Sequence, residues 1–172
     1  PACAWPAQTP APTATRRQSR RRWTRQAMTA RRSLNIFFDV DYTILAVDGS
    51  LRPRTREVFE RLVADGHRLF IWSGVGNRSS DVRRHGLHDL VTSVFVKPLE
   101  DFEAGLRALG VTVRPDFVVD DYPSIVNAFG GAVVRPYYFP TPEDDEMQRV
   151  YRIVVDYVTR GHSQDAAFRP GL

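Results

Sequence analysis

The 172-residue chain contains little cysteine, almost no lysine and no long apolar run. Its one cysteine, Cys3, cannot form an internal disulfide, which excludes a disulfide scaffold and favours a reducing compartment. No apolar stretch reaches the roughly 18 to 20 residues that cross a bilayer. Arginines and prolines interrupt the start of the chain, where a secretory signal needs an apolar core. We therefore expect a cytoplasmic protein with no membrane partner.

Acidic residues are absent from positions 1–32, which hold eight arginines. The rest of the chain carries 16 basic and 20 acidic residues, so the net charge of +4 combines a +8 leader with a −4 remainder. The leader, rich in Pro, Ala, Thr and Arg, predicts a disordered basic tail. Its composition is also typical of a nucleic-acid-binding arm, of an organelle transit peptide, or of a cloning or start-site extension ahead of Met28. We expect one domain over 33–162 and a C-terminal tail over 163–172.

Lysine occurs once, at Lys97 in the segment SVFVKPLED (93–101), beside 23 arginines. A lysine ammonium is a compact point charge, whereas an arginine guanidinium is a broad planar fork. A single lysine in an arginine-rich chain therefore indicates a crowded position that needs a small cation.

Short apolar runs alternate with amphipathic segments over residues 33–162. The runs predict strands at 34–38, 68–72, 93–96, 116–119 and 132–135, and the amphipathic segments predict helices at 55–66, 78–86, 99–109, 124–129 and 141–161. Thr55 and Thr141 are candidate N-caps, and Leu99, Phe102, Leu106 and Leu109 are expected to face inward. This alternation is typical of an α/β fold with a doubly wound, Rossmann-like parallel sheet and helices on both faces.

Polar residues follow four of these predicted strands. They are Asp39 and Asp41, Ser73 and Gly74, Lys97, and Asp120 and Asp121. Ligands of such sheets bind at the carboxyl ends of the strands, so we expect these groups to converge. The Asp39–Asp41 pair implies a hard cation such as Mg²⁺, and Asp121 could complete its oxygen ligands. Ser73, the Gly74 backbone and Lys97 suit the oxygens of a phosphoryl group.

In chain order, DVDYT (39–43), WSG (72–74), VKP (96–98) and VVDD (118–121) resemble the four motifs of the haloacid dehalogenase-like (HAD) superfamily. The resemblance covers about 130 residues. It implies a phosphatase, because Asp41 is an acid that the dehalogenase members lack.

The resemblance also implies a role for each motif residue. Asp39 would be the nucleophile that forms an aspartyl-phosphate, and Asp41 the general acid and base. Ser73, Gly74 and Lys97 would bind the phosphoryl group. Supporting roles would fall to Thr43 and Asp120. Metal ligands would be Asp39, Asp121 and the backbone carbonyl of Asp41, although the choice between Asp120 and Asp121 stays open.

One departure from the family concerns motif four, where many members carry a further acid at a position that Ser124 or Ile125 occupies here. The spacing within the chain also matters: Asp39 to Ser73 and Ser73 to Lys97 are too short to hold an inserted cap domain. We therefore expect a capless member with a small β-hairpin flap over 43–53, which turns at Asp48–Gly49. Trp72, Tyr122, Arg135, Tyr137 and Tyr138 are candidates for the mouth of an open site.

The predicted activity is Mg²⁺-dependent hydrolysis of a phosphate monoester, carried by a small molecule or a macromolecule. The alternatives are a phosphoryl-accepting module that resembles a signalling receiver, and a non-catalytic binding domain of the same α/β class. A receiver carries its lysine on the last strand, whereas Lys97 precedes the Asp120–Asp121 pair. A homo-oligomer is compatible with the sequence.

Overall fold

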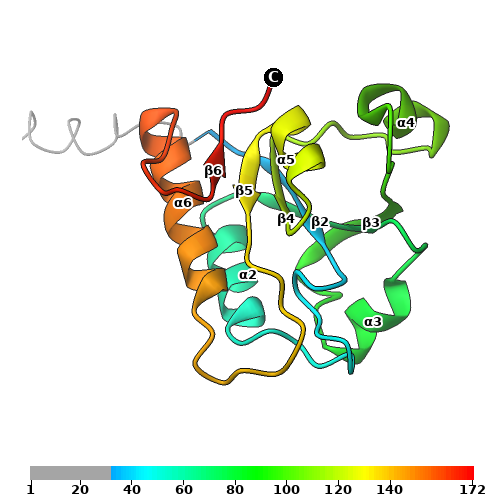
Figure 1. The fold of residues 1–172 in the computed structure, drawn as a ribbon, viewed down its shortest axis with the longest axis vertical. Coiled ribbons are helices and arrows are strands. Elements are labelled where there is room, and N and C mark those ends of the chain that lie inside the picture. Colours follow the sequence, from blue (N-terminus) through cyan, green and yellow to red (C-terminus); the bar gives the residue numbers. More distant parts are fainter. Residues whose placement is uncertain (1–31) are drawn as a thin grey trace, which may run out of the picture. The chain divides into compact units, whose positions relative to one another are not determined.

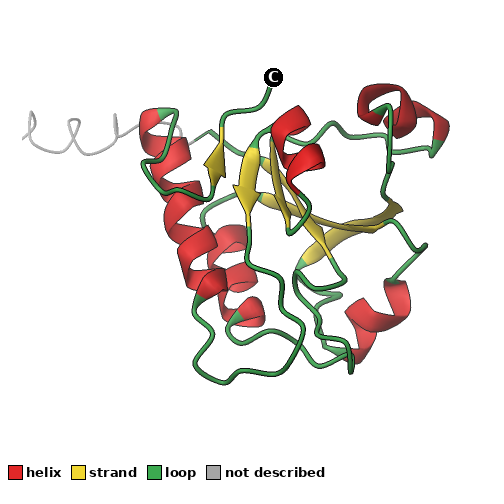
Figure 2. Ribbon diagram, in the orientation of Figure 1, coloured by secondary structure: helices red, strands yellow, loops and turns green. Residues whose placement is uncertain are grey.

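The computed structural model describes residues 32–172, so the predictions made for residues 1–31 lie outside the described part of the chain. Strands and helices alternate along most of it (Figures 1 and 2). The strands are β1 (Asn35–Asp39), β2 (Arg68–Ser73), β3 (Val91–Val96), β4 (Phe117–Asp120), β5 (Gly131–Val133) and β6 (Phe168–Arg169). The helices are α2 (Thr55–Ala64), α3 (Ser79–Arg84), α4 (Phe102–Ala108), α5 (Pro123–Phe129) and α6 (Glu146–Arg160).

The six strands form one sheet in the order β3-β2-β1-β4-β5-β6, and the first five run parallel. The α/β class and the mainly parallel sheet predicted from the sequence are therefore confirmed. From β1 the chain moves outward through β2 to β3, then crosses back to β4 on the other side of β1. The strand order thus reverses between β1 and β4, and in open α/β sheets such a reversal leaves a crevice at the carboxyl ends of the strands.

Successive residues of a strand point to opposite faces of the sheet. Because the strand residues are apolar on both faces, helices cover both faces and bury them. Ile36 and Phe38 of β1 join a buried cluster with residues of α2 and α6, whereas Phe37 joins a second cluster with residues of α4 and α5. Figure 1 shows α2 and α6 side by side on one face. The buried apolar strands hold the carboxyl edge in place without using the polar residues that follow them.

One helix begins later than the sequence predicted, and a second has a different N-cap. Helix α6 starts at Glu146, not near Thr141: residues 141–144 form a turn instead, in which the Asp144 N–H donates to the Thr141 carbonyl at 3.0 Å, and Arg52 binds the Asp144 carboxylate. Helix α2 does start at Thr55, but the residue before it, Arg54, adopts a left-handed conformation and caps it. Thr55 therefore lies inside the helix, where its hydroxyl donates to the Arg52 carbonyl at 2.8 Å, and it is not an N-cap.

Helix α4 is shorter than the predicted segment 99–109, and two of the four residues expected to face inward do not. Leu106 is buried, but Leu99 and Leu109 are exposed. Both lie outside the helix, since Asp101 has a positive φ that breaks the backbone before Phe102 and Leu109 already caps the other end. The helical spacing of apolar residues in the sequence therefore continues past both ends of the helix that forms.

The predicted C-terminal tail, 163–172, instead contributes strand β6, which pairs antiparallel to β5. Ala132 pairs with Phe168 and Gly131 with Arg169, and Ala167 is buried beside them. A strand of two residues is too short to show a periodicity, so no sequence pattern predicts it.

The segment 43–53, predicted as a hairpin flap, is largely packed against the domain. It contains isolated bridges from Leu45 to Asp41 and Leu51, and Gly49 turns the chain with a φ of 78°. Ile44 and Leu45 are buried, and the Arg52 guanidinium binds Asp144 through two hydrogen bonds of 2.8 and 2.9 Å. This anchoring favours a fixed loop over a mobile flap. Among residues 32–172, no helix has both the length and the apolarity to cross a bilayer.

Candidate active site at the carboxyl edge of the sheet

The candidate site forms where β1 and β4 end side by side. Phe38 pairs in register with Val119, so Asp39 and Asp120 follow on neighbouring strands at the reversal of strand order. Both side chains are buried. A run of apolar strand residues thus delivers two carboxylates to the same edge of the sheet.

Lys97 reaches both carboxylates from the end of β3. Its Nζ lies 2.6 Å from Asp39 Oδ1 and 2.8 Å from Asp120 Oδ2, and its backbone N–H donates to the Ser73 carbonyl at 3.0 Å. Asp120 Oδ1 in turn accepts the Tyr122 N–H at 2.9 Å. We call Asp39, Lys97, Asp120 and the adjacent Asp121 the inner cluster. A buried ammonium between two buried carboxylates is the compact cation that the single lysine predicted.

Electrostatics in the inner cluster favour protonated carboxyls. Burial raises the pKa of Asp39 to about 7, and the charge of Asp120 adds to the rise while Lys97 opposes it. Burial likewise raises the pKa values of Asp120 and Asp121. Burial acts to lower the pKa of Lys97, but the charges of Asp39 and Asp120 outweigh it and the pKa is raised. If all three acids were ionised, the single positive charge of Lys97 would not offset their negative charge.

These three acids could hold a metal ion. Asp39, Asp120 and Asp121 each offer a carboxylate oxygen, and the three oxygens lie within 4.8 Å of one another. Hard divalent cations prefer such oxygens, and a cation would offset the charge that burial penalises. Both members of the Asp120–Asp121 pair belong to this set, but both oxygens of Asp120 already accept hydrogen bonds, from Lys97 and from the Tyr122 N–H, so the choice between the two acids stays open.

Asp41 lies apart from this set and forms a second group. Its Oδ2 accepts the Ser73 hydroxyl at 3.0 Å, and its Oδ1 lies 3.1 Å from Arg78 Nη1. We call Asp41, Ser73 and Arg78 the outer cluster. Ser73, which the sequence predicted as a phosphate ligand, is therefore bonded to the predicted general acid.

The turn after β1 separates the two aspartates. The amides of Thr43, Ile44 and Leu45 all approach the Val40 carbonyl at 2.9 to 3.3 Å, and Tyr42 takes a left-handed φ of 62°. The buried Thr43 hydroxyl accepts the Asp121 N–H at 3.1 Å, which ties this turn to the end of β4. Thr43 therefore connects the first and fourth sequence motifs.

The other predicted residues divide between the interior and the surface. Gly74 lies under Leu99, since a Cβ at Gly74 would come within 2.6 Å of Leu99 Cδ2. Trp72 and Tyr137 are buried and do not line a mouth, whereas Tyr122, Tyr138 and Arg135 are exposed. Trp72 is buried because its ring packs in the core, where it contacts Phe37 with ring centroids 4.8 Å apart.

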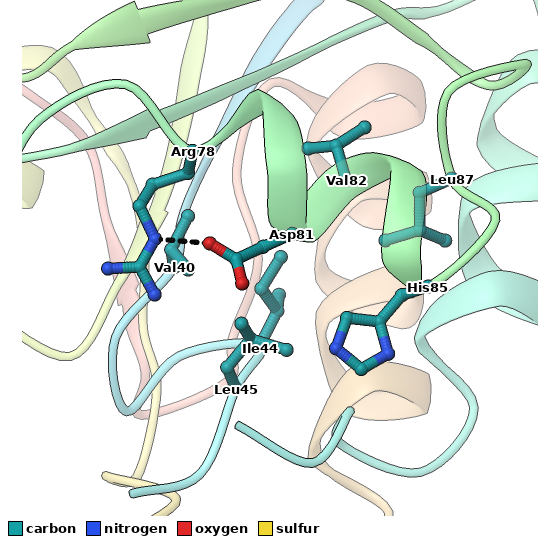
Figure 3. Close-up of a pocket in the computed structure, with 8 residues that line it drawn as sticks. All are labelled: Val40, Ile44, Leu45, Arg78, Asp81, Val82, His85 and Leu87. Atoms are coloured by element: carbon teal, nitrogen blue, oxygen red, sulfur yellow. Dashed lines mark hydrogen bonds and ion pairs between the residues drawn. The ribbon is translucent and has the colours of Figure 1, made fainter. Parts of the chain in front are cut away.

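Sequence reasoning missed Arg78, which enters the site from the residue before α3. Its Nε donates to Asp81 Oδ2 at 2.8 Å while Nη1 reaches Asp41. Figure 3 shows this arginine and Asp81 beside a small cavity of about 10 Å³ between α3 and the turn after β1. Arg78 is one of 23 arginines in the chain, so its identity alone does not indicate a role in the site.

Comparisons with protein-family models, with curated proteins and with solved structures found no significant match.

Proposed function

We propose that this protein is a Mg²⁺-dependent phosphatase that hydrolyses phosphate monoesters through an aspartyl-phosphate on Asp39. The observation that carries the proposal is the inner cluster, in which Lys97 binds Asp39 and Asp120 beside Asp121. Support also comes from the four motifs at successive strand ends and from their resemblance to the HAD superfamily. The strand order, with β1 central and its carboxyl end at the reversal, agrees with a doubly wound fold of that type.

Each residue of the site has a role in the proposed reaction. Asp39 attacks phosphorus, and Lys97 orients its carboxylate through the 2.6 Å contact and balances its charge. Asp41 gives a proton to the leaving oxygen and then takes one from the attacking water. Ser73 and the backbone at Gly74 hold phosphoryl oxygens. Hydrolysis of the aspartyl-phosphate returns Asp39 as a carboxylate and releases inorganic phosphate.

The residues that would hold Mg²⁺ are Asp39, Asp120 and Asp121. When bound, the ion would offset the negative charge of these carboxylates and polarise a phosphoryl oxygen. A protein with the Asp39 pKa near 7 needs such a charge to keep its nucleophile ionised at neutral pH.

We propose a bulky or macromolecular phosphoester as the substrate class. Within residues 32–172, the segments between β1 and β2 and between β2 and β3 contain α2 and α3 but no inserted domain. A small substrate would therefore have no cap from this chain to enclose it.

Phosphate release from an aryl phosphate tests the proposal. We expect turnover with Mg²⁺, none above background with a chelator, and a loss of at least about 1,000-fold in Asp39→Asn, because the nucleophile is gone. Asp89→Asn is the matched control, since Asp89 is an exposed acid that pairs with Arg56 away from the site.

Other outcomes separate the alternatives. Unchanged turnover in Asp39→Asn would remove the proposed nucleophile. A protein that becomes phosphorylated by a small phosphodonor but releases no phosphate would favour the receiver-like alternative. Inactivity on a broad panel of phosphoesters, together with no phosphorylated protein, would favour a binding domain.

A further inference from the structure

Arg78 occupies a position that the four motifs do not assign. It lies between the two acids Asp41 and Asp81, with its Nη1 at 3.1 Å from Asp41 Oδ1 and 3.3 Å from Asp41 Oδ2. Its Nε is held by Asp81 at 2.8 Å. Figure 3 shows the guanidinium extending past Asp81 and away from α3, alongside Val40 of the turn after β1. One end of the fork is therefore anchored, and the other end faces the site.

The partners of Asp41 conflict with the roles in the proposed reaction. A general acid must reach the leaving oxygen with its carboxyl group, but both oxygens of the Asp41 carboxylate are held by donors, since Ser73 and Arg78 donate to them. The same contacts occupy the hydroxyl that should bind the phosphoryl group. We interpret this arrangement as a resting state, in which Asp41 accepts hydrogen bonds from the two donors, Ser73 and Arg78, that an incoming phosphate would use.

The charges of the site favour an exchange of partners. Within the described residues 32–172, Lys97 and Arg78 are the only basic side chains that form ion pairs with the four carboxylates of Asp39, Asp41, Asp120 and Asp121, and Lys97 already binds two of them. A monoester dianion brings two further negative charges. Arginine forms bidentate contacts with phosphate, and the anchor to Asp81 leaves the Nη atoms free to change partner.

We propose that Arg78 is a second phosphate-binding residue, which Asp41 holds in the resting site and releases to the substrate. On binding, a phosphoryl dianion takes the Ser73 hydroxyl and the Arg78 guanidinium from Asp41, and the Asp41 carboxyl group is then free to turn toward the leaving oxygen. No covalent bond changes in this step. The inference depends on the proposed function, because it assigns a substrate contact within the same site.

The exchange is tested by measuring, with titration calorimetry, the affinity of the full chain for inorganic phosphate in the presence of Mg²⁺. We expect Arg78→Ala to weaken binding by about 10-fold or more, because a charged hydrogen-bond donor is lost. Arg78→Lys should retain part of the affinity, since it keeps the charge but loses the fork. Arg84→Ala is the matched control: Arg84 also pairs with Asp81, at 3.8 Å, but does not contact Asp41, so phosphate affinity should not change.

A double-mutant cycle with Asp41→Asn separates exchange from simple charge removal. Loss of the Asp41 charge should tighten phosphate binding in any background, but release of Arg78 can occur only where Arg78 is present. We therefore expect the gain from Asp41→Asn to be at least about threefold larger in the wild type than in Arg78→Ala. An arginine that serves only to cap α3 would give equal gains, although both variants could be less stable.

The outcomes distinguish this inference from the proposed function. If the wild type hydrolyses aryl phosphate but Arg78→Ala binds phosphate normally, or the two gains are equal, the inference is wrong and the phosphatase proposal stands. If the wild type neither binds phosphate nor hydrolyses the ester, both fail together. Thermal unfolding of each variant establishes that a change in affinity is not a loss of fold.

Discussion

The inner and outer clusters both pair carboxylates with a basic side chain, but they differ in how far water reaches them. In the inner cluster the side chains of Lys97, Asp39 and Asp120 are 10%, 5% and 0% exposed, whereas in the outer cluster those of Arg78 and Asp41 are 22% and 36% exposed. Water screens the second ion pair more than the first. The more exposed Arg78–Asp41 pair is therefore the weaker of the two, as the proposed exchange of partners requires, whereas the less exposed pairs of Lys97 hold Asp39 and Asp120 in place.

The largest expected effect is on the buried pair. In Lys97→Ala the carboxylates of Asp39 and Asp120 lose their cation, and we expect a loss of about 3 kcal/mol or more in the free energy of unfolding. Urea denaturation at pH 8.5 with a chelator measures it, because lower pH would protonate the acids and Mg²⁺ would replace the lost charge.

Lys97→Arg is the matched variant for that measurement, since it keeps the charge but adds bulk. We expect stability between that of the wild type and Lys97→Ala, with turnover well below wild type. Wild-type turnover in Lys97→Arg would show that the crowding argument is wrong. A cost below about 1 kcal/mol for Lys97→Ala would mean that the buried pair behaves like a surface pair.

A second prediction concerns pH and metal in the inner cluster. The pKa of Asp39 is raised from 3.8 to about 7 in the folded protein, so between these values the folded state binds more protons than the unfolded state. Without metal, stability should therefore fall as pH rises from about 4 to 7 and level off above. The raised pKa values of Asp120 and Asp121 act in the same direction.

Thermal unfolding across this pH range, with a chelator or with Mg²⁺, measures the effect. Mg²⁺ should raise the Tm more at pH 8 than at pH 5, where protons compete with it. Asp39→Asn should flatten the metal-free profile. A metal-free Tm that rises steadily over the same interval would contradict the raised pKa. Below pH 3.8 the sign reverses for Asp144, whose pKa is lowered and whose contribution is lost on protonation.

A smaller effect is expected in the outer cluster. Ser73→Ala removes the donor to Asp41 and the acceptor of the Val75 N–H, which lies 3.3 Å away. We expect a loss of about 1 kcal/mol in the free energy of unfolding, well below that of Lys97→Ala. Urea denaturation of Ser73→Ala and Ser73→Thr compares loss of the hydroxyl with its retention. A cost equal to that of Lys97→Ala would remove the distinction between the clusters.

The smallest effect provides the reference for both clusters. Glu57 and Arg54 form an exposed pair at 3.4 Å, with side chains about half exposed. Glu57→Gln should change the free energy of unfolding by less than about 0.5 kcal/mol. A larger change would indicate that the two clusters cannot be ranked by exposure alone.

Much of the fold could be predicted because burial leaves a pattern in the sequence. The apolar runs at 34–38 and 68–72 correspond to β1 and β2 within one residue at each end, and the helix predicted over 55–66 corresponds to α2, with Gly66 beyond its end at a φ of 91°. Strand β6 and the left-handed Arg54 could not be predicted. Both depend on tertiary contacts, which a local pattern does not record.

The candidate site likewise contains residues that could be predicted from the sequence and residues that could not. Lys97 was detectable because it is the single lysine, and Asp39 and Asp120 because they end apolar strands. Arg78 was not detectable, since its identity is common in this chain and its role depends on where α3 lies. The exposure of Leu99 was missed because helical spacing was extended through a residue, Asp101, with a positive φ.

The antiparallel pairing of β6 with β5 has a practical consequence. Arg169 pairs with Gly131, the first residue of β5, so the chain after β6 leaves from the amino edge of the parallel strands, as the C mark in Figure 1 shows. The candidate site lies at the opposite, carboxyl edge. A biotin or an affinity tag attached after Leu172 would therefore hold the protein on a sensor surface with its acidic edge facing the solution. Large phosphorylated partners, which a surface-facing site would exclude, could then be screened directly on the immobilised protein.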